Sequence, residues 1–308
     1  MGKKRIIVYI ACLVAMWFWS LSFIWYKDVY VYFTPFATVF FRLVISSALL
    51  FSAAFLFRKL QKVRKEDYKN IFLLSVFEPF LYFVGESQGM LYVSPTTASV
   101  IISMIPLLVP IAAFYFLKER LLIKNIIGII ISCAGVVLVV LNKDFAFSVS
   151  LKGVLLLSIS VVAAVFYSVT LKKLADVYNP LTLIAWQNTF GILLFLPLVL
   201  IFERHGLHKG LLAIDPMIPL FKLAIFASSG AFLLYAFSVK QLGAVKANIF
   251  TNLIPVLTAL LSFWLLNERL LFHNILGIFV VIGGLVLSQL NPMKLNNGLY
   301  KRFCKIGK

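Results

Sequence analysis

Three charged side chains interrupt long apolar stretches in the first third of the chain: Arg42 in "FFRLVISSALL", and Glu78 and Glu86 in "FEPFLYFVGESQGMLY". Glu78, Tyr82 and Glu86 recur at every fourth residue, so on a helix they share one slowly drifting face. An ionised group in an apolar environment is costly, and such groups pair, bind a ligand or take up a proton. For Arg42 and Glu86 three interpretations stay open: a structural ion pair, contact with a substrate, and protonation of a glutamate.

Pro79 directly follows Glu78, and a proline inside a helix frees a carbonyl in the preceding turn. The sequence therefore predicts a local kink. Such a kink would suit an ion or substrate site, or would serve as a packing bend beside a water-filled cavity. On the same segment Gly85 and Gly89 form a GxxxG pattern, which predicts close packing against another helix.

The elements that must position these groups are apolar runs that recur along the whole chain. Of the 308 residues, 62% are apolar and 13% are charged, against roughly 45–50% and 25% in soluble domains. A run of about 20 apolar residues can cross a ~30 Å hydrocarbon layer as a helix, and a soluble chain of this size could not bury so many. The sequence predicts an all-α integral membrane protein with ten transmembrane helices, at 6–26, 35–57, 69–92, 96–117, 124–141, 152–172, 181–202, 217–239, 246–266 and 273–290.

The formal net charge of +18 is unevenly distributed. When the N-terminus is placed in the cytoplasm, most of the 29 Lys and Arg residues fall in inner loops, as the positive-inside rule requires. We therefore expect both termini in the cytoplasm, an uncleaved first span within 2–26, and a basic tail at 296–308 that lies on anionic headgroups. This distribution disfavours nucleic acid as a partner. No motif predicts a cofactor, a metal site or a catalytic residue.

The chain contains an internal repeat. "SMIPLLVPIAAFYFLKERL" at 103–121 returns as "NLIPVLTALLSFWLLNERL" at 252–270, and the glycines that follow keep the same offset of 149 residues. The sequence thus predicts one five-helix repeat at 1–145 and a second at 150–295. Because five is odd, the second repeat would enter the membrane from the opposite side. Inverted repeats of this kind are typical of secondary transporters that work by alternating access.

The repeated pattern also carries a resemblance. In both halves a proline is followed after twelve residues by Glu-Arg, then by a glycine eight residues on and another seven further: Pro106, Glu119, Arg120, Gly128 and Gly135, and Pro255, Glu268, Arg269, Gly277 and Gly284. In a ten-span chain of about this length the pattern resembles the EamA family of the drug/metabolite transporter superfamily. The resemblance implies a bacterial inner-membrane exporter of amino acids, related metabolites or toxic organic compounds.

Polar residues recur at matching places in the two halves. At the offset of 149, Ser99 and Ser103 match Asn248 and Asn252, and the members of each pair are four residues apart on one helix face. One interpretation is a cavity on the pseudo-twofold axis that these groups line. The other is a set of interhelical hydrogen bonds, worth about 0.6 kcal/mol each, that only hold the helices together.

The same comparison places Glu86 opposite Tyr235, and alignment of the second span with the seventh places Arg42 opposite Gln187. Polar or ionisable groups at equivalent depths are what a cavity between two related halves needs. Aromatic residues in these spans could stack on a substrate or lie in the interfacial belt: Trp19, Trp186 and Tyr235.

The sequence therefore predicts a carrier of small organic solutes, with export by alternating access favoured. We expect it to contact membrane lipids, and its transport could be coupled to protons. Importers or exchangers of nucleotide sugars or phosphate esters, and exporters of drugs or quaternary ammonium compounds, remain alternatives. A lipid-modifying enzyme would need clustered His, Asp or Glu at a membrane face, which the loops lack, so we expect no enzyme activity. The candidate substrate-binding residues are Trp19, Arg42, Glu78, Tyr82, Glu86, Ser99, Ser103, Trp186, Gln187, Tyr235, Asn248 and Asn252.

Overall fold

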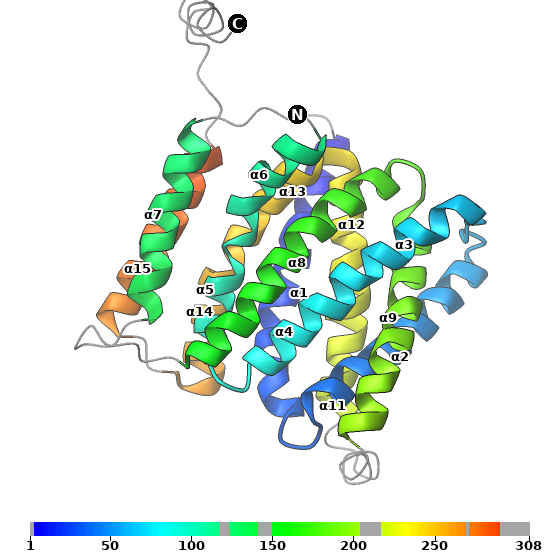
Figure 1. Cartoon of the computed structure of the whole chain (residues 1–308), viewed down its shortest axis with the longest axis horizontal. Helices are drawn as coiled ribbons and strands as arrows, with labels where there is room; N and C mark the ends of the chain where they lie inside the picture. The colour runs from blue at the N-terminus through cyan, green and yellow to red at the C-terminus, as the bar shows by residue number, and fades with distance from the viewer. Residues whose placement is uncertain (1–2, 118–122, 141–149, 204–216, 269–270, 290–308) are drawn as a thin grey trace, which may run out of the picture.

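The computed structural model is a bundle of helices (Figure 1). No strand occurs among the described residues, so the all-α prediction is confirmed for them. The Glu119-Arg120 pair, Arg269 and the tail at 296–308 lie outside the described residues. The structure describes residues 3–117, 123–140, 150–203, 217–268 and 271–289.

The first part of the chain forms α1 (Lys3–Val29), α2 (Pro35–Leu56), η1 (Lys65–Asp67), α3 (Tyr68–Ser75), η2 (Val76–Leu81), α4 (Tyr82–Gly89), α5 (Pro95–Ile102), α6 (Ile105–Leu117) and α7 (Ile123–Val140). The second part forms α8 (Leu151–Ala175), α9 (Pro180–Phe202), α11 (Met217–Lys222), η3 (Leu223–Ala231), α12 (Phe232–Leu242), α13 (Ala244–Asn248), η4 (Ile249–Asn252), α14 (Leu253–Leu266) and α15 (Phe272–Gln289).

Seven helical stretches of the described chain are long and apolar enough to cross a membrane, which supports an integral membrane protein. The other three predicted spans also fall on helical segments, namely α3 to α4, α7 and α15. The seven stretches are Ile6–Val29, Pro35–Leu56, Pro95–Phe116, Leu151–Ala175, Pro180–Phe202, Met217–Leu242 and Ala244–Leu266.

Proline sets the start of three helices, because its fixed φ suits the first helical position and its missing N–H is not needed there. α5 and α9 add a side-chain cap: Ser94 Oγ accepts a hydrogen bond from the N–H of Thr97 at 3.3 Å, and Asn179 Oδ1 accepts one from Thr182 at 2.8 Å. α2 also starts at a proline, but Thr34 before it makes no such cap.

A carboxyl from the end of another helix lies beside the N-terminus of α2. Glu203, which directly follows α9, lies near enough to the hydroxyl of Thr34 and the backbone of Phe36 and Ala37 to accept hydrogen bonds, while its Oε2 is buried without a partner among the described residues. Burial raises the pKa of the Glu203 carboxyl, and these hydrogen bonds hold the rise back. The carboxylate therefore lies between the end of α9 and the start of α2.

The kink expected at Pro79 is present. Glu78 has an extended backbone, with φ −147° and ψ 120°, inside the π-helical turn η2 that separates α3 from α4. A second π-helical turn, η3, lies between α11 and α12. π-Helical turns are rare and are frequently found at functional sites.

Small residues lie at the places where helix backbones approach each other closely. α4 packs on α8, and a Cβ added at Gly89 would lie 2.8 Å from the side chain of Leu157, which confirms the predicted close-packing face. α2 packs along α9, and α1 packs on both α12 and α14. α7 and α15 lie side by side at one edge of the bundle (Figure 1).

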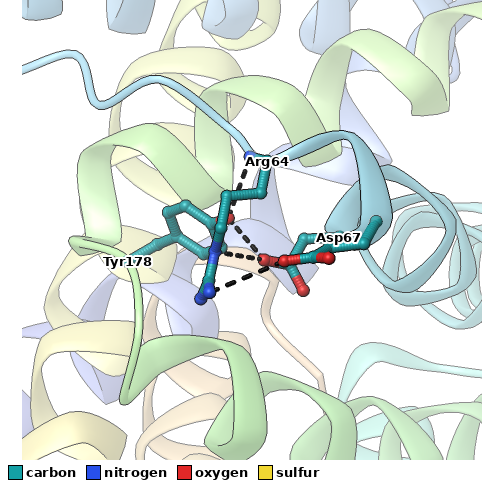
Figure 2. Close-up of polar contacts among 4 residues, drawn as sticks. Arg64, Asp67 and Tyr178 are labelled. Atoms are coloured by element: carbon teal, nitrogen blue, oxygen red, sulfur yellow. Dashed lines mark hydrogen bonds and ion pairs between the residues drawn. The ribbon is translucent and has the colours of Figure 1, made fainter.

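A polar cluster fastens the segment between α2 and α3 onto the turn between α8 and α9 (Figure 2). The backbone N–H of Arg64 donates to the hydroxyl of Tyr178 at 3.1 Å, and this hydroxyl donates to Asp67 Oδ2 at 2.6 Å. Asp67 also pairs with Arg64 Nε at 3.1 Å. Nearby, the backbone N–H of Gln61 donates to the hydroxyl of Thr182 at 2.9 Å.

The α7–α15 contact yields a prediction. A Cβ at Gly284 would lie 2.7 Å from the carbonyl of Gly128 and 2.7 Å from the backbone N of Ser132, so Gly284→Ala forces the two helices apart. We expect a loss of about 1–3 kcal/mol, the usual cost of overpacking, seen as a lower melting temperature in detergent. The adjacent Gly283 meets nothing within 4 Å, so Gly283→Ala is the matched control and should leave the melting temperature equal or higher. Equal destabilisation by both substitutions would contradict the close contact.

Candidate functional site

A cavity lies inside the bundle, and its walls lie close together. Residues of α1, α2, η2, α4, α5, α6, α8, α12, α13, η4 and α14 contribute to these walls. Pockets that combine apolar walls with a few polar groups are the usual sites for small organic ligands. The predicted site residues among the lining are Trp19, Arg42, Glu78, Tyr82, Glu86, Tyr235 and Asn248.

Arg42 and Glu86 are joined through a tyrosine. Arg42, only 1% exposed, donates from Nη1 to the hydroxyl of Tyr26 at 2.5 Å, and this hydroxyl donates to Glu86 Oε2 at 3.0 Å. The hydroxyl of Tyr82 donates to the other carboxylate oxygen at 2.9 Å. Among the described residues no direct Arg42–Glu86 ion pair occurs, so the pairing considered from the sequence takes a bridged form.

Arg42 is held by two further contacts. Its Nε donates to the hydroxyl of Ser228 in η3 at 2.7 Å, and its guanidinium carbon lies 4.4 Å from the ring centroid of Phe83. A guanidinium at this distance from an aromatic ring is attracted by the ring electrons. The arginine thus links α2 to α1, α4 and η3.

Glu78 lines the same cavity in a different situation. Its side chain is 6% exposed, and within the described part of the chain it makes no hydrogen bond and no ion pair. The extended backbone at this residue lies at the kink, where the regular helix is interrupted. Glu78 is therefore a second buried carboxylate in the cavity, and no described residue donates a hydrogen bond to it.

The remaining polar groups form a neutral cluster on α8, α12 and α13. Asn248 Nδ2 donates to Ser168 Oγ at 3.3 Å and to the carbonyl of Ala244 at 2.9 Å, and Ser168 Oγ lies 3.5 Å from the hydroxyl of Tyr235. The ring of Trp19 lies 5.1 Å from the ring of Tyr235. This cluster can exchange hydrogen bonds with a solute but carries no formal charge.

Five predicted residues do not line the cavity. Ser99 and Ser103 donate to the carbonyls of Thr96 and Val100 on their own helical turns, at 2.7 and 2.6 Å. Trp186 packs on the rings of Phe51 and Tyr68, whose centroids lie 5.6 and 5.5 Å away. Gln187 lies one residue behind the wall, where its Oε1 accepts a hydrogen bond from Tyr167 at 3.3 Å. Asn252 is 8% exposed and is also absent from the lining.

Sequence reasoning missed Tyr26, Ser228 and Ser168. Tyr26 is fully buried but stands near the end of its apolar run, beside Lys27, where a tyrosine is expected to lie in the interfacial belt. The two serines carry no mark in the sequence that separates them from other serines of apolar segments. Only the register between helices reveals their contacts.

A family model matches the chain twice. The model for the EamA-like transporter family covers residues 6–141 and again residues 151–290. The chain belongs to the EamA-like transporter family. The family membership confirms the resemblance seen in the repeated motif, and with the apolar helices it makes the chain a multi-pass membrane protein.

Curated relatives of this family member are named as transporters. An uncharacterized transporter of Archaeoglobus fulgidus is 30% identical over 270 residues, which cover 88% of this chain and 94% of the relative. The uncharacterized transporter YetK of Bacillus subtilis is 27% identical, with 80% of this chain and 76% of the relative covered. The uncharacterized transporter YdfC of the same bacterium is 25% identical, with 96% of this chain and 95% of the relative covered.

A solved crystal structure shares the fold of this EamA-like chain. It superposes with a TM-score of 0.72 over 96% of this chain and 98% of its own, at 16% sequence identity. At this identity the likeness shows the fold alone. Family and relatives together indicate a membrane transporter, and a protein without enzyme activity is consistent with their names.

The bridge through Tyr26 predicts how the buried charges support the fold. Arg42→Gln removes the one guanidinium in the cavity lining and leaves two buried carboxylates without a cation, which should cost about 3–5 kcal/mol. The melting temperature in detergent checks this, with the exposed Lys69→Gln as the charge-matched control. The double variant with Glu86→Gln should recover part of the loss. A melting temperature for Arg42→Gln equal to that of Lys69→Gln would contradict the coupling.

Proposed function

We propose that this chain is a secondary transporter that moves small organic solutes, such as amino acids or related metabolites, outward across the bacterial inner membrane by alternating access. The observation that carries the proposal is the cavity with its buried charges, which is lined from both matched segments: Arg42 and Glu86 come from the first, and Tyr235 and Asn248 from the second. Buried ionisable groups in membrane segments usually mark a transport pathway.

The proposal includes ten spans arranged as two inverted five-helix repeats, at 1–145 and 150–295. The twofold match of the family model to 6–141 and 151–290 supports it. The π-helical turns η2 and η3 support it as well, because they interrupt equivalent segments of the two parts. Val76, the first residue of η2, corresponds at the repeat offset of 149 to Ile225, which lies within η3. In this arrangement the basic loops place both termini in the cytoplasm.

Polar contacts at the two ends of the bundle support alternating access. At one end the hydroxyl of Thr96, in the first turn of α5, donates to Glu268 Oε2 at 2.9 Å. At the opposite end the cluster of Arg64, Asp67 and Tyr178 joins the α2–α3 segment to the α8–α9 turn (Figure 2). Both contacts link the two matched segments, and we infer that each breaks when the cavity opens on its side.

The cavity residues divide by chemistry. Arg42, Glu78 and Glu86 supply charge, Asn248 supplies hydrogen bonds, and the aromatic walls come from Trp19, Tyr82 and Tyr235. In this proposal Trp186 and Gln187 act as contacts between helices, Ser99 and Ser103 bond within their own helical turns, and Asn252 lies outside the cavity lining.

The alternatives differ in the charge that they need. A nucleotide sugar or a phosphate ester carries negative charges that call for several cations, and Arg42 is the only basic residue in the cavity lining. Two carboxylates and several aromatic rings favour a solute with positive charge instead. An exporter of organic cations is therefore the second candidate.

A cavity-filling variant tests the proposal. Ala164 lines the cavity on α8, so Ala164→Phe occupies the solute space without changing a charge. We expect the uptake of labelled amino acids and amines into proteoliposomes to fall by about 10-fold or more, because a packed interior does not yield space for an added ring.

The control lies two residues away. Val162 is 52% exposed on the outside of the same helix, so Val162→Phe should transport like the parent protein. Uptake should be measured with and without an imposed pH gradient, and the melting temperature verifies that both variants fold. Undiminished uptake by a folded Ala164→Phe protein would rule out this cavity as the pathway.

A further inference from the structure

The two cavity glutamates are engaged to different degrees. Both oxygens of Glu86 accept a hydrogen bond from a tyrosine hydroxyl, at 3.0 Å from Tyr26 and at 2.9 Å from Tyr82. Because the oxygen of Tyr26 already accepts a hydrogen bond from Arg42, its single proton is directed to Glu86. Glu86 is thus fixed as an acceptor on both sides, which suits the ionised carboxylate.

The guanidinium of Arg42 is committed to the same assembly. It donates to Tyr26 and to Ser228 and lies over the ring of Phe83. All of these partners are buried or lie against the cavity, so a change of partner by Arg42 would break several contacts at once. The positive charge of Arg42 therefore offsets the negative charge of Glu86 through the Tyr26 hydroxyl.

Glu78 is left with an uncompensated charge. Among the described residues that line the cavity, the charged groups are one guanidinium and two carboxylates, so an ionised Glu78 makes this lining net negative. Its 6% exposure makes such a charge costly, and a bound cation or a proton must offset it. The kinked backbone presents this carboxylate where no helical neighbour supplies a fixed donor.

The walls around the cavity favour one kind of cation. The ring of Trp19 lies 5.1 Å from that of Tyr235 and 5.2 Å from that of Phe232, and the rings of Tyr167 and Phe83 also line the space. Aromatic faces attract ammonium groups and also accommodate an apolar body. A compact protonated amine with an apolar body therefore matches both the walls and the lone carboxylate.

We propose that Glu78 is the carboxylate that binds the cationic nitrogen of the transported solute, while Tyr26 is a positioning residue that holds Glu86 and Arg42 outside this exchange. The inference rests on the transporter function proposed above and adds the class of solute. In the absence of solute a proton neutralises Glu78, so the ammonium group and the proton compete for one carboxylate. Binding of the amine then releases a proton from Glu78, and departure of the amine is followed by proton uptake. The other ionisable groups that face Glu78 are Arg42, Glu86, Tyr82, Tyr167 and Tyr235.

The experiment measures binding and proton release together on the full-length protein in weakly buffered detergent. The probes are phenethylamine, a primary ammonium, and its neutral analogue 2-phenylethanol. We expect the amine to bind with release of up to about one proton per protein and the alcohol to bind at least ~10-fold more weakly, because it cannot offset the charge of Glu78. Equal binding of the alcohol and the amine would overturn the inference.

Variants assign the proton to one residue. Glu78→Gln should lose the proton release and weaken amine binding by about 30-fold or more, whereas Tyr26→Phe, which keeps all three charges of the lining, should bind less tightly yet still release the proton. The exposed Glu66→Gln is the control and should behave like the parent protein. Proton release that persists in Glu78→Gln would overturn the assignment.

A transport experiment distinguishes failure of this inference from failure of the proposed function. Proteoliposomes with the parent protein and with Glu78→Gln are tested for uptake of phenethylamine, of zwitterionic phenylalanine and of neutral 2-phenylethanol. Transport of phenylalanine alone, unaffected by Glu78→Gln, would sustain the transporter and overturn the role of Glu78. Absence of uptake of all three probes would overturn the transporter proposal and the inference with it. Amine uptake that depends on Glu78 supports both.

Discussion

The cost of ionised groups in an apolar interior is the constraint on which the rest of this structure depends. Arg42 lies inside the membrane-length stretch Pro35–Leu56 and Glu86 lies on α4, and both side chains are buried away from water. Tyr26 resolves the cost by bridging the two charges with one hydroxyl. The bridge requires α1, α2 and α4 to meet at one depth, and the bond from Arg42 to Ser228 adds η3. The arrangement of half the bundle around the cavity thus follows from a few polar contacts.

The sequence was sufficient for features that depend on local spacing. Apolar run lengths predicted the helices, the spacing of Glu78, Tyr82 and Glu86 predicted a shared face, and Pro79 predicted the kink. Features that depend on the register between helices could not be predicted from the sequence. Ser99 and Ser103 match Asn248 and Asn252 by position, yet a serine in a helix can bond a carbonyl of its own preceding turn. That local option removes a serine from a cavity without leaving a trace in the sequence.

Tyr26 also could not be identified from the sequence, because its local context predicts a different role. A tyrosine near the end of an apolar run is normally an interfacial residue, because its ring is apolar and its hydroxyl seeks water. In this fold the hydroxyl finds Arg42 and Glu86 instead, and the side chain is completely buried. Its partners lie 16 and 60 residues away along the chain. Neither distance corresponds to a helical period, so no pattern in one segment could identify the three as a unit.

Two kinds of helix contact in this bundle differ in how readily they can change. α7 and α15 meet through glycines and through the hydroxyl of Ser132, which donates to the carbonyl of Val281 at 2.9 Å, so their backbones approach too closely to slide. The contacts at the ends of the bundle are polar, such as Thr96 with Glu268 and Tyr178 with Asp67. Side chains at a membrane surface can exchange such partners for water at small net cost, because the net value of one hydrogen bond is about 1 kcal/mol. In the proposed mechanism, a fold that joins rigid helix pairs by exchangeable contacts at both ends opens on either side while the charges of Arg42 and Glu86 stay compensated through Tyr26.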